Sequence, residues 1–207
     1  STARPVNTTV KWDGAPAIFA GTDPRDGKFF IAKKGVFNVN PKIYKTDSEI
    51  DADISGDLAA KFKLALKYLP ALGIEGVIQG DFLYSNDTLS SEVIDGEKVV
   101  TFHPNTIVYA VPLNSDLGRT IRASSIGIVW HTVYSGDSFE SMKASFGQDI
   151  STKLKKTKQV WHTDATYKDV SGSATMTAKE TAAVTSLLSS AGKTFRGISA
   201  KTLNTIA

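Results

Sequence analysis

Residues 10–35 read VKWDGAPAIFAGTDPRDGKFFIAKKG. Two short apolar runs, Ala17–Ala20 and Phe29–Ala32, lie on either side of Asp23–Gly27. That segment holds the aspartate, proline and glycine residues that favour turns. The stretch therefore predicts a strand, a turn and a return strand, which form a β-meander.

The rest of the chain adds one amphipathic helix and more strands. A helix is expected from about Asp57 to Leu72, because Leu58, Phe62 and Leu69 recur at helical spacing. The run at Asp95-Gly96 predicts a hairpin turn. Further strands are expected over Gly76–Tyr84, Lys98–Phe102, Ile107–Val111 and Ile126–Val133.

Three other segments complete the expected order of elements. Residues 36–55 are expected to form a loop, and Ser138–Phe146 a short helix. Thr177 and Glu180 have the spacing of a capping box, which predicts a helix ending near Ala191. Helices segregated from strands favour an α+β fold with an antiparallel sheet core, peripheral helices and a helical C-terminal segment.

Composition sets limits on the class of protein. The 207 residues suit one domain or a domain with a small appendage, and 41% of them are hydrophobic, enough for a core. A net charge of +3 is compatible with nucleotide phosphates or nucleic acid. Because the chain has no cysteine, it has no disulfide framework and no cysteine-bound zinc, which fits a cytoplasmic location.

Neither a membrane span nor a signal peptide is expected from the sequence. The chain begins at Ser1 without a methionine, which favours a fragment or a processed product. His103, His131 and His162 have no metal-ligand spacing, so no zinc site is expected. The basic run Lys153–Lys158 is interpreted as a solvated surface, with a nucleic-acid contact as the alternative.

The run Lys11-Trp12-Asp13-Gly14 carries the strongest chemical signal. A lysine becomes a nucleophile when burial or a neighbouring cation favours its neutral amine. Gly14 would permit a close backbone approach, and Asp13 could orient the lysine or a sugar hydroxyl. Lys33 and Lys34 could add positive potential beside phosphates. A solvated lysine on a surface turn is the alternative interpretation of this short motif.

The order of these segments resembles the covalent nucleotidyltransferases, which are the ATP-dependent DNA and RNA ligases and the mRNA capping enzymes. Lys11–Gly14 is similar to their first motif, and Phe29–Gly35 to the next one. Gly80–Leu83 resembles the third motif, Ile107–Ala110 the aromatic strand that follows, and Ile126–Val129 the fourth. The run also resembles uncharacterised ligase-like proteins of tailed bacteriophages.

This resemblance implies a ligase-type adenylation core, related to the ATP-grasp fold, over residues 1–133. Residues 134–207 would be its C-terminal part or a small helical appendage. The implied reaction is transfer of AMP from ATP to Lys11 with Mg²⁺, followed by sealing or adenylation of RNA or DNA ends. The implied roles are Asp81 for metal or ribose and Tyr109 for stacking on adenine. The other residues implied to bind the nucleotide are Asp13, Gly14, Lys33, Lys34, Lys153 and Lys155.

Two departures from the family pattern favour a second hypothesis. Ile126 stands where the fourth motif has a metal-binding glutamate. The fifth motif, a Lys-x-Lys strand, is matched in spacing only by Lys153/Lys155 and Lys156/Lys158. The alternative is therefore an inactive, ligase-like nucleotide-binding or structural protein. Transfer of GMP instead of AMP, the type of acceptor and the oligomeric state stay open.

Overall fold

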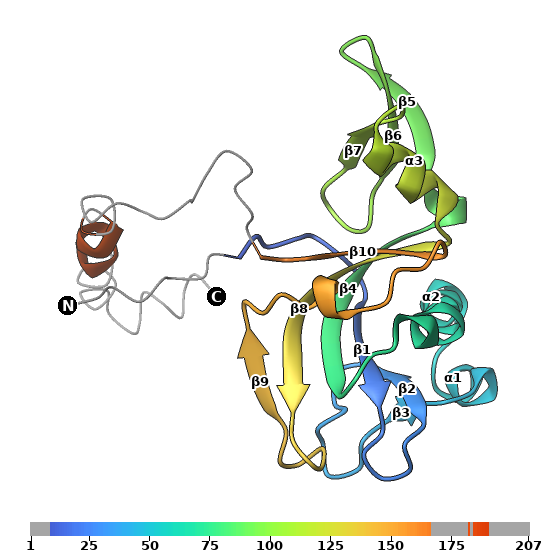
Figure 1. Cartoon of the computed structure of the whole chain (residues 1–207), viewed down its shortest axis with the longest axis vertical. Helices are drawn as coiled ribbons and strands as arrows, with labels where there is room; N and C mark the ends of the chain where they lie inside the picture. Colours follow the sequence, from blue (N-terminus) through green and yellow to red (C-terminus); the bar gives the residue numbers. More distant parts are fainter. Residues whose placement is uncertain (1–8, 167–181, 183, 191–207) are drawn as a thin grey trace, which may run out of the picture. The chain divides into compact units, whose positions relative to one another are not determined.

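The computed structural model describes residues 9–166, 182 and 184–190 (Figure 1). The chain divides into two units, one of which spans Asn7–Tyr167 and contains the elements labelled in Figure 1. This unit extends beyond residue 133, where the sequence suggested that the core ends. The two units are described separately below.

A seven-stranded sheet forms the larger part of the Asn7–Tyr167 unit. Its strands are β1 (Ala17–Thr22), β2 (Phe29–Ala32), β3 (Ile43–Tyr44), β4 (Val77–Ser85), β8 (Ile126–Ser135), β9 (Lys143–Phe146) and β10 (Val160–Asp164). They follow the order β10-β8-β4-β1-β2-β3, and β9 also pairs with β8. The pairs are antiparallel except for β8 and β10, which are parallel.

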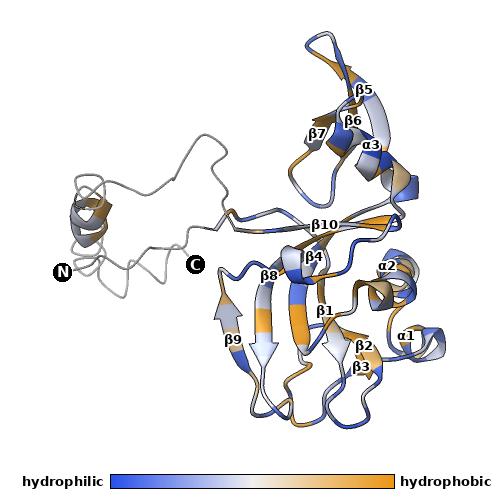
Figure 2. Ribbon diagram, in the orientation of Figure 1, coloured by the Kyte–Doolittle hydropathy of each residue, from blue (hydrophilic) through white to orange (hydrophobic). Residues whose placement is uncertain are grey.

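Two helices, α1 (Asp47–Asp53) and α2 (Gly56–Tyr68), pack on one face of this sheet (Figure 1). Their buried side chains, including Ile50 and Phe62, share a core with apolar residues of the central strands. Figure 2 shows this apolar character along β4 and β8. A 3₁₀ turn, η1 (Leu69–Leu72), extends α2, and the expected helix is thus confirmed.

The face of β4 and β8 that points away from α2 carries a different set of side chains. Phe82 of β4 and Ile128 and Trp130 of β8 point into the core beneath α2. Because side chains alternate along a strand, Asp81 and Val129 point to the other face. The packing of α2 therefore determines which residues of β4 and β8 can line a site.

A smaller sheet lies beyond the end of β4. It consists of β5 (Ser90–Ile94), β6 (Glu97–Phe102) and β7 (Tyr109–Pro112), and helix α3 (Asp116–Ala123) packs beside it. The turn between β5 and β6 has positive φ angles at Asp95 (51°) and Gly96 (81°). Aspartate and glycine tolerate this conformation, so the sequence prediction of a hairpin here is confirmed.

The expected α+β class, with mainly antiparallel sheets, is confirmed. Two local predictions were wrong. Residues 36–55 contain β3 and α1 instead of only a loop, and a capping box at Thr46 and Glu49 begins α1. Ser138–Phe146 contains β9 instead of a helix, because its last residues pair with β8. Helix α3 and strand β10 were not predicted.

The second unit is described only at residues 182 and 184–190, which are helical. The expected C-terminal helix is confirmed for these residues. Its capping residues, Thr177 and Glu180, lie outside the described residues. Within the parts that the structure describes, no helix is both long enough and apolar enough to cross a bilayer.

Candidate functional site

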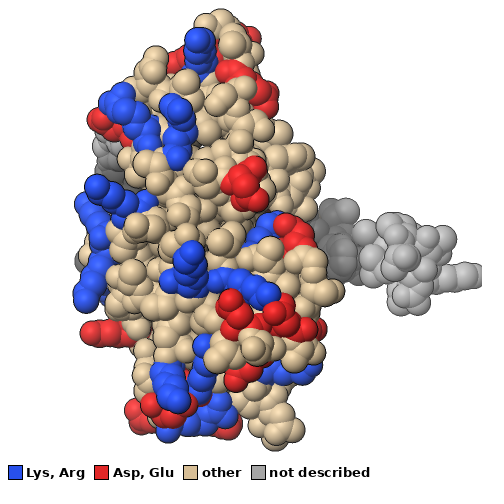
Figure 3. Space-filling model, turned by 90° about the vertical axis from the view of Figure 1, so that its right-hand side faces the viewer, with Lys and Arg blue, Asp and Glu red and all other residues tan. Residues whose placement is uncertain are grey.

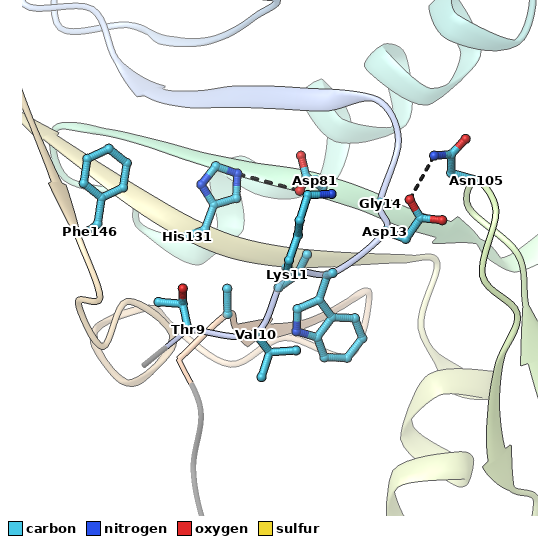
Figure 4. Close-up of a pocket in the computed structure, with 12 residues that line it drawn as sticks. Thr9, Val10, Lys11, Asp13, Gly14, Asp81, Asn105, His131 and Phe146 are labelled. Carbon is cyan, nitrogen blue, oxygen red and sulfur yellow. Dashed lines mark hydrogen bonds and ion pairs between the residues drawn. The ribbon is translucent and has the colours of Figure 1, made fainter. Parts of the chain in front are cut away.

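A cavity of about 550 Å³ lies on the face of β4 and β8 that α2 leaves free. This volume falls within the range of small-molecule sites. Figure 4 shows the side chains of Lys11, Asp81 and His131 directed into it. The full lining is Thr9, Val10, Lys11, Trp12, Asp13, Gly14, Asp81, Asn105, Val129, His131, Phe146 and Ala165.

The segment that carries Lys11 is held at both of its ends. On one side, the Val10 amide donates to the Ala165 carbonyl oxygen at 2.6 Å, just past β10. On the other, the Ala15 amide donates to the Phe82 carbonyl oxygen at 2.9 Å, on β4. These two hydrogen bonds attach the Lys11 segment to the end of β10 and to β4, two strands that are not neighbours in the sheet. They position Lys11 as an exposed side chain at the cavity.

Gly14 lies against β4 at a distance that excludes a side chain. A Cβ atom added at Gly14 would lie 2.5 Å from Asp81 Cβ and 3.1 Å from the Phe82 carbonyl oxygen. Any other residue would push the segment away from β4. The glycine of the motif therefore brings Lys11 and Asp81 to one cavity, and the backbone that it approaches closely is that of β4.

Asp13 anchors this segment to the loop between β6 and β7. Its carboxylate accepts hydrogen bonds from Asn105 Nδ2 at 2.9 Å, from the Thr106 amide at 2.6 Å and from the Ile107 amide at 2.8 Å. The bond from Asn105, followed by those from Ile107 and Thr106, lowers the pKa of Asp13 below its usual value. With these donors in place, Asp13 positions the lysine segment and is not directed at a ligand.

Tyr109 supports the same segment with its hydroxyl and its ring. The Asp13 amide donates to the Tyr109 hydroxyl oxygen at 2.8 Å. The ring stacks on Trp12 and on Phe102, each with ring centroids 5.1 Å apart. Tyr109 is not among the residues that line the cavity, and its expected role in stacking on adenine stays a prediction.

Asp81 and His131 face each other across the cavity (Figure 4). The distance from His131 Nε2 to Asp81 Oδ2 is 3.7 Å, and both side chains are partly exposed. His131 is two residues after Val129 and so lies on the same face of β8. The β4–β8 register shifts at this point, since Gly80 pairs with Trp130 and Gln79 with Thr132. His131 is thus an extra residue in a β-bulge, a feature that often re-aims a side chain beside a site.

Lys33 and Lys34 do not line this cavity. Lys33 Nζ instead lies 2.8 Å from a carboxylate oxygen of Asp53, in a cluster with Lys42 and Tyr44. Lys34 is exposed. The Lys-Lys-Gly segment is thus separate from Lys11 in this structure, because the chain after β2 turns toward α1.

Lys153 and Lys155 line a second cavity, of about 360 Å³, together with Gly73, Ile74, Glu75, Ile78, Val133, Asp149, Ile150 and Leu154. Lys153 ends a short 3₁₀ turn, and Lys155 follows it in a loop, so neither lies on a strand. Lys153 and Lys155 have the spacing of the fifth motif, but they do not lie beside Lys11. Among the strands that pair with β8, β4 and β10 carry no lysine, and β9 carries Lys143.

Ile126 is fully buried in the core beneath α2. Its side chain faces away from the cavity, so a glutamate at this position would not reach Lys11. Across the described residues, no three histidine, cysteine, aspartate or glutamate side chains group as metal ligands. The sequence did not single out Asn105, whose place depends on the contact with Asp13. It named His131 as one of three histidines without metal-ligand spacing, and the structure places it in the cavity.

The whole chain, residues 1–207, matches the model of a family of unknown function, DUF6267. The chain belongs to this family. No curated protein and no solved structure matches it. The function must therefore be inferred from the site itself.

Proposed function

We propose that this DUF6267 protein is a magnesium-dependent nucleotidyltransferase of RNA or DNA ligase type, with Lys11 as the residue that accepts the nucleotide. The observation that carries the proposal is that Lys11 shares one cavity with Asp81 and His131. Asp13 and Gly14 hold the lysine segment in place. A motif on a solvated surface turn would need neither a cavity nor such anchors.

The proposed reaction forms one bond and breaks another. The neutral amine of Lys11 attacks the α-phosphorus of ATP, and a nitrogen–phosphorus bond forms. The bond between the α-phosphorus and the bridging oxygen breaks, and pyrophosphate leaves with that oxygen. The amine loses its remaining extra proton to solvent or to a base in the cavity, and the product is lysyl-AMP.

Asp81 is the residue best suited to hold magnesium. Its carboxylate lines the cavity and is partly exposed, whereas that of Asp13 already accepts three hydrogen bonds. Mg²⁺ is commonly held by one or two carboxylates, with substrate phosphates and water completing its shell. When bound, the ion would neutralise charge on the phosphates. One carboxylate is therefore sufficient for this role.

A nucleic-acid end is the proposed acceptor of AMP. The 5′-phosphate would displace Lys11 from the AMP phosphorus, and a 3′-hydroxyl would then displace AMP. A basic surface is supplied by exposed Lys153, which ends η3 (Ser151–Lys153), and by the exposed lysines 155, 156 and 158 that follow it. Figure 3 shows basic side chains gathered along one edge of the face it presents. Such a surface favours a polyanion, with affinity that falls as salt rises.

One observation favours an alternative function, nucleotide binding without covalent transfer. Lys11 is the one lysine among the described residues that line the cavity. The covalent mechanism places further lysines against the phosphates, but Lys33, Lys34, Lys153 and Lys155 lie elsewhere. A protein that kept the fold and lost the reaction would bind ATP and leave Lys11 unmodified.

Labelling with nucleotide distinguishes the two functions. The full-length protein is incubated with ATP labelled at the α-phosphate and Mg²⁺, then denatured and separated from free nucleotide. The proposal predicts label that stays on wild-type protein and on Lys28→Ala, an exposed lysine outside the cavity. Label should be absent from Lys11→Ala. Bound ATP without covalent label would support the alternative, and a parallel reaction with GTP tests the base preference.

A further inference from the structure

The contact between Asp81 and His131 has a spacing that suits two ligands of one metal ion. Nε2 and Oδ2 are 3.7 Å apart, which is too long for a hydrogen bond. A divalent ion about 2.1 Å from each atom would fit between them. Their side chains are 28% and 22% exposed, so both can reach a ligand in the cavity while their strands hold them.

The orientation of His131 is fixed from its other side. Its Nδ1 atom lies 2.7 Å from Oγ1 of Thr132, and Thr132 is buried. If Nδ1 carries the proton and donates it to this hydroxyl, Nε2 presents a lone pair to the Asp81 carboxylate. Two electron-rich groups facing each other are stabilised by a cation between them. Metal-binding histidines commonly have such a partner on the second nitrogen.

The other charged groups near the pair do not supply an equivalent site. Asp13 already accepts three hydrogen bonds from the β6–β7 loop. The Lys11 side chain extends toward Asp81 in Figure 4, but the structure records no salt bridge between them. A cation held by Asp81 and His131 would lie close to Lys11, where positive charge favours the neutral amine.

We propose that Asp81 and His131 are two ligands of a divalent transition-metal ion, with phosphate oxygens and water completing its shell. The nucleotide part of this inference rests on the proposed function, whereas the two protein ligands do not. An imidazole ligand favours a transition ion such as Mn²⁺ over Mg²⁺, which prefers oxygen. The site therefore binds Mn²⁺ more tightly than Mg²⁺.

Electron paramagnetic resonance with Mn²⁺ alone tests this site without measuring activity. Titration of wild-type protein should show bound Mn²⁺, and pulsed spectra should show coupling to an imidazole ¹⁴N nucleus. His131→Ala should remove the nitrogen coupling and weaken Mn²⁺ binding at least about tenfold. Asp81→Asn should weaken binding while it retains the coupling. His103→Ala, an exposed histidine outside the cavity, should match wild type.

Three results would overturn the inference: no bound Mn²⁺, bound Mn²⁺ without nitrogen coupling, or a coupling that persists in His131→Ala. His131→Gln provides a second variant, and circular dichroism verifies that each variant is folded. The result of the metal-binding experiment can be distinguished from the result of the nucleotide-transfer experiment. Lysyl label formed with Mg²⁺ but without a Mn²⁺–histidine site would reject only the metal inference. A Mn²⁺–histidine site without lysyl label would reject only the proposed reaction.

Discussion

The two lysine-bearing cavities differ in how their charges are arranged. In the Lys11 cavity, residues from β4, β8 and the segment before β1 place a lysine, a carboxylate and an imidazole in one space. In the second cavity, Lys153 and Lys155 are exposed on a loop and lie beside apolar residues from the start of β4 and the end of β8. Lysines and carboxylates line both cavities, because the second also includes Glu75 and Asp149. The first differs in that it adds an imidazole and in that hydrogen bonds on either side of Lys11 hold the segment that carries it.

The largest effect that separates the cavities is expected from Asp81→Asn. This change removes the charge that would hold a metal ion, while it preserves size, and should lower the rate of lysyl labelling about 100-fold. Glu75→Gln makes the same chemical change in the second cavity and should leave the rate within about twofold, as expected away from special features. Equal losses in both variants would contradict the assignment of chemistry to the first cavity.

Gly14→Ala tests the close approach that joins Lys11 to β4. The new methyl group would meet Asp81 Cβ and the Phe82 carbonyl oxygen, so the lysine segment must move. Because small displacements of reacting groups are costly, labelling should fall on the order of tenfold. Quantitative labelling at saturating ATP measures the effect. An unchanged rate in a folded protein would show that this contact does not position Lys11.

Tyr109→Phe removes a smaller part of the support for the Lys11 segment. The Asp13 amide loses its acceptor, whereas the stacked ring is retained, so the free energy of unfolding should fall by about 1 kcal/mol. Labelling should fall only a few-fold. Tyr134→Phe, which loses a 2.8 Å bond to Gln79, is the matched control for stability. Urea denaturation and labelling are measured together, and a loss of labelling as large as in Asp81→Asn would contradict this supporting role.

The smallest effect on labelling is expected from Lys153→Ala combined with Lys155→Ala. Both lysines lie outside the Lys11 cavity, so the formation of lysyl-AMP should be unchanged. Affinity for a nucleic-acid end should fall, and the slope of its logarithm against that of salt concentration should decrease by about 2. Fluorescence anisotropy at several salt concentrations measures this. If this double variant lost labelling, the result would show that these lysines take part in forming lysyl-AMP.

The sequence predicted those helices and strands in which the spacing of apolar residues matches the side chains that the fold buries. The helix over α2 and the strands β1, β2 and β4 were all expected from apolar patterns. Helix α1 is too short to show a full apolar stripe, although its Thr46-x-x-Glu49 capping box could have revealed it. Strand β9 is exposed throughout and is determined by pairing with β8, which local sequence does not encode.

Residues of the site could be predicted from the sequence only where they lie together in one short motif or in a recognisable strand. Lys11, Asp13 and Gly14 lie within four residues, and Asp81 lies within a strand that was expected, β4, so all four could be named from the sequence. His131 lies on the cavity face of β8 by simple alternation, but only the pairing of β8 with β4 brings it opposite Asp81, and a single strand does not reveal that pairing. The positions of Lys33 and of Lys153 and Lys155 required knowledge of how the chain turns after β2 and before β10.

The central claim is that Lys11 itself becomes bonded to the nucleotide. After reaction with ATP and a divalent ion, the protein is digested and its peptides are analysed by mass spectrometry under conditions that preserve the nitrogen–phosphorus bond. The account predicts that the peptide containing Lys11 gains the mass of one adenylyl group and loses it on brief treatment with acid. Adduct on another residue, or no adduct on folded protein that binds ATP, would contradict the account.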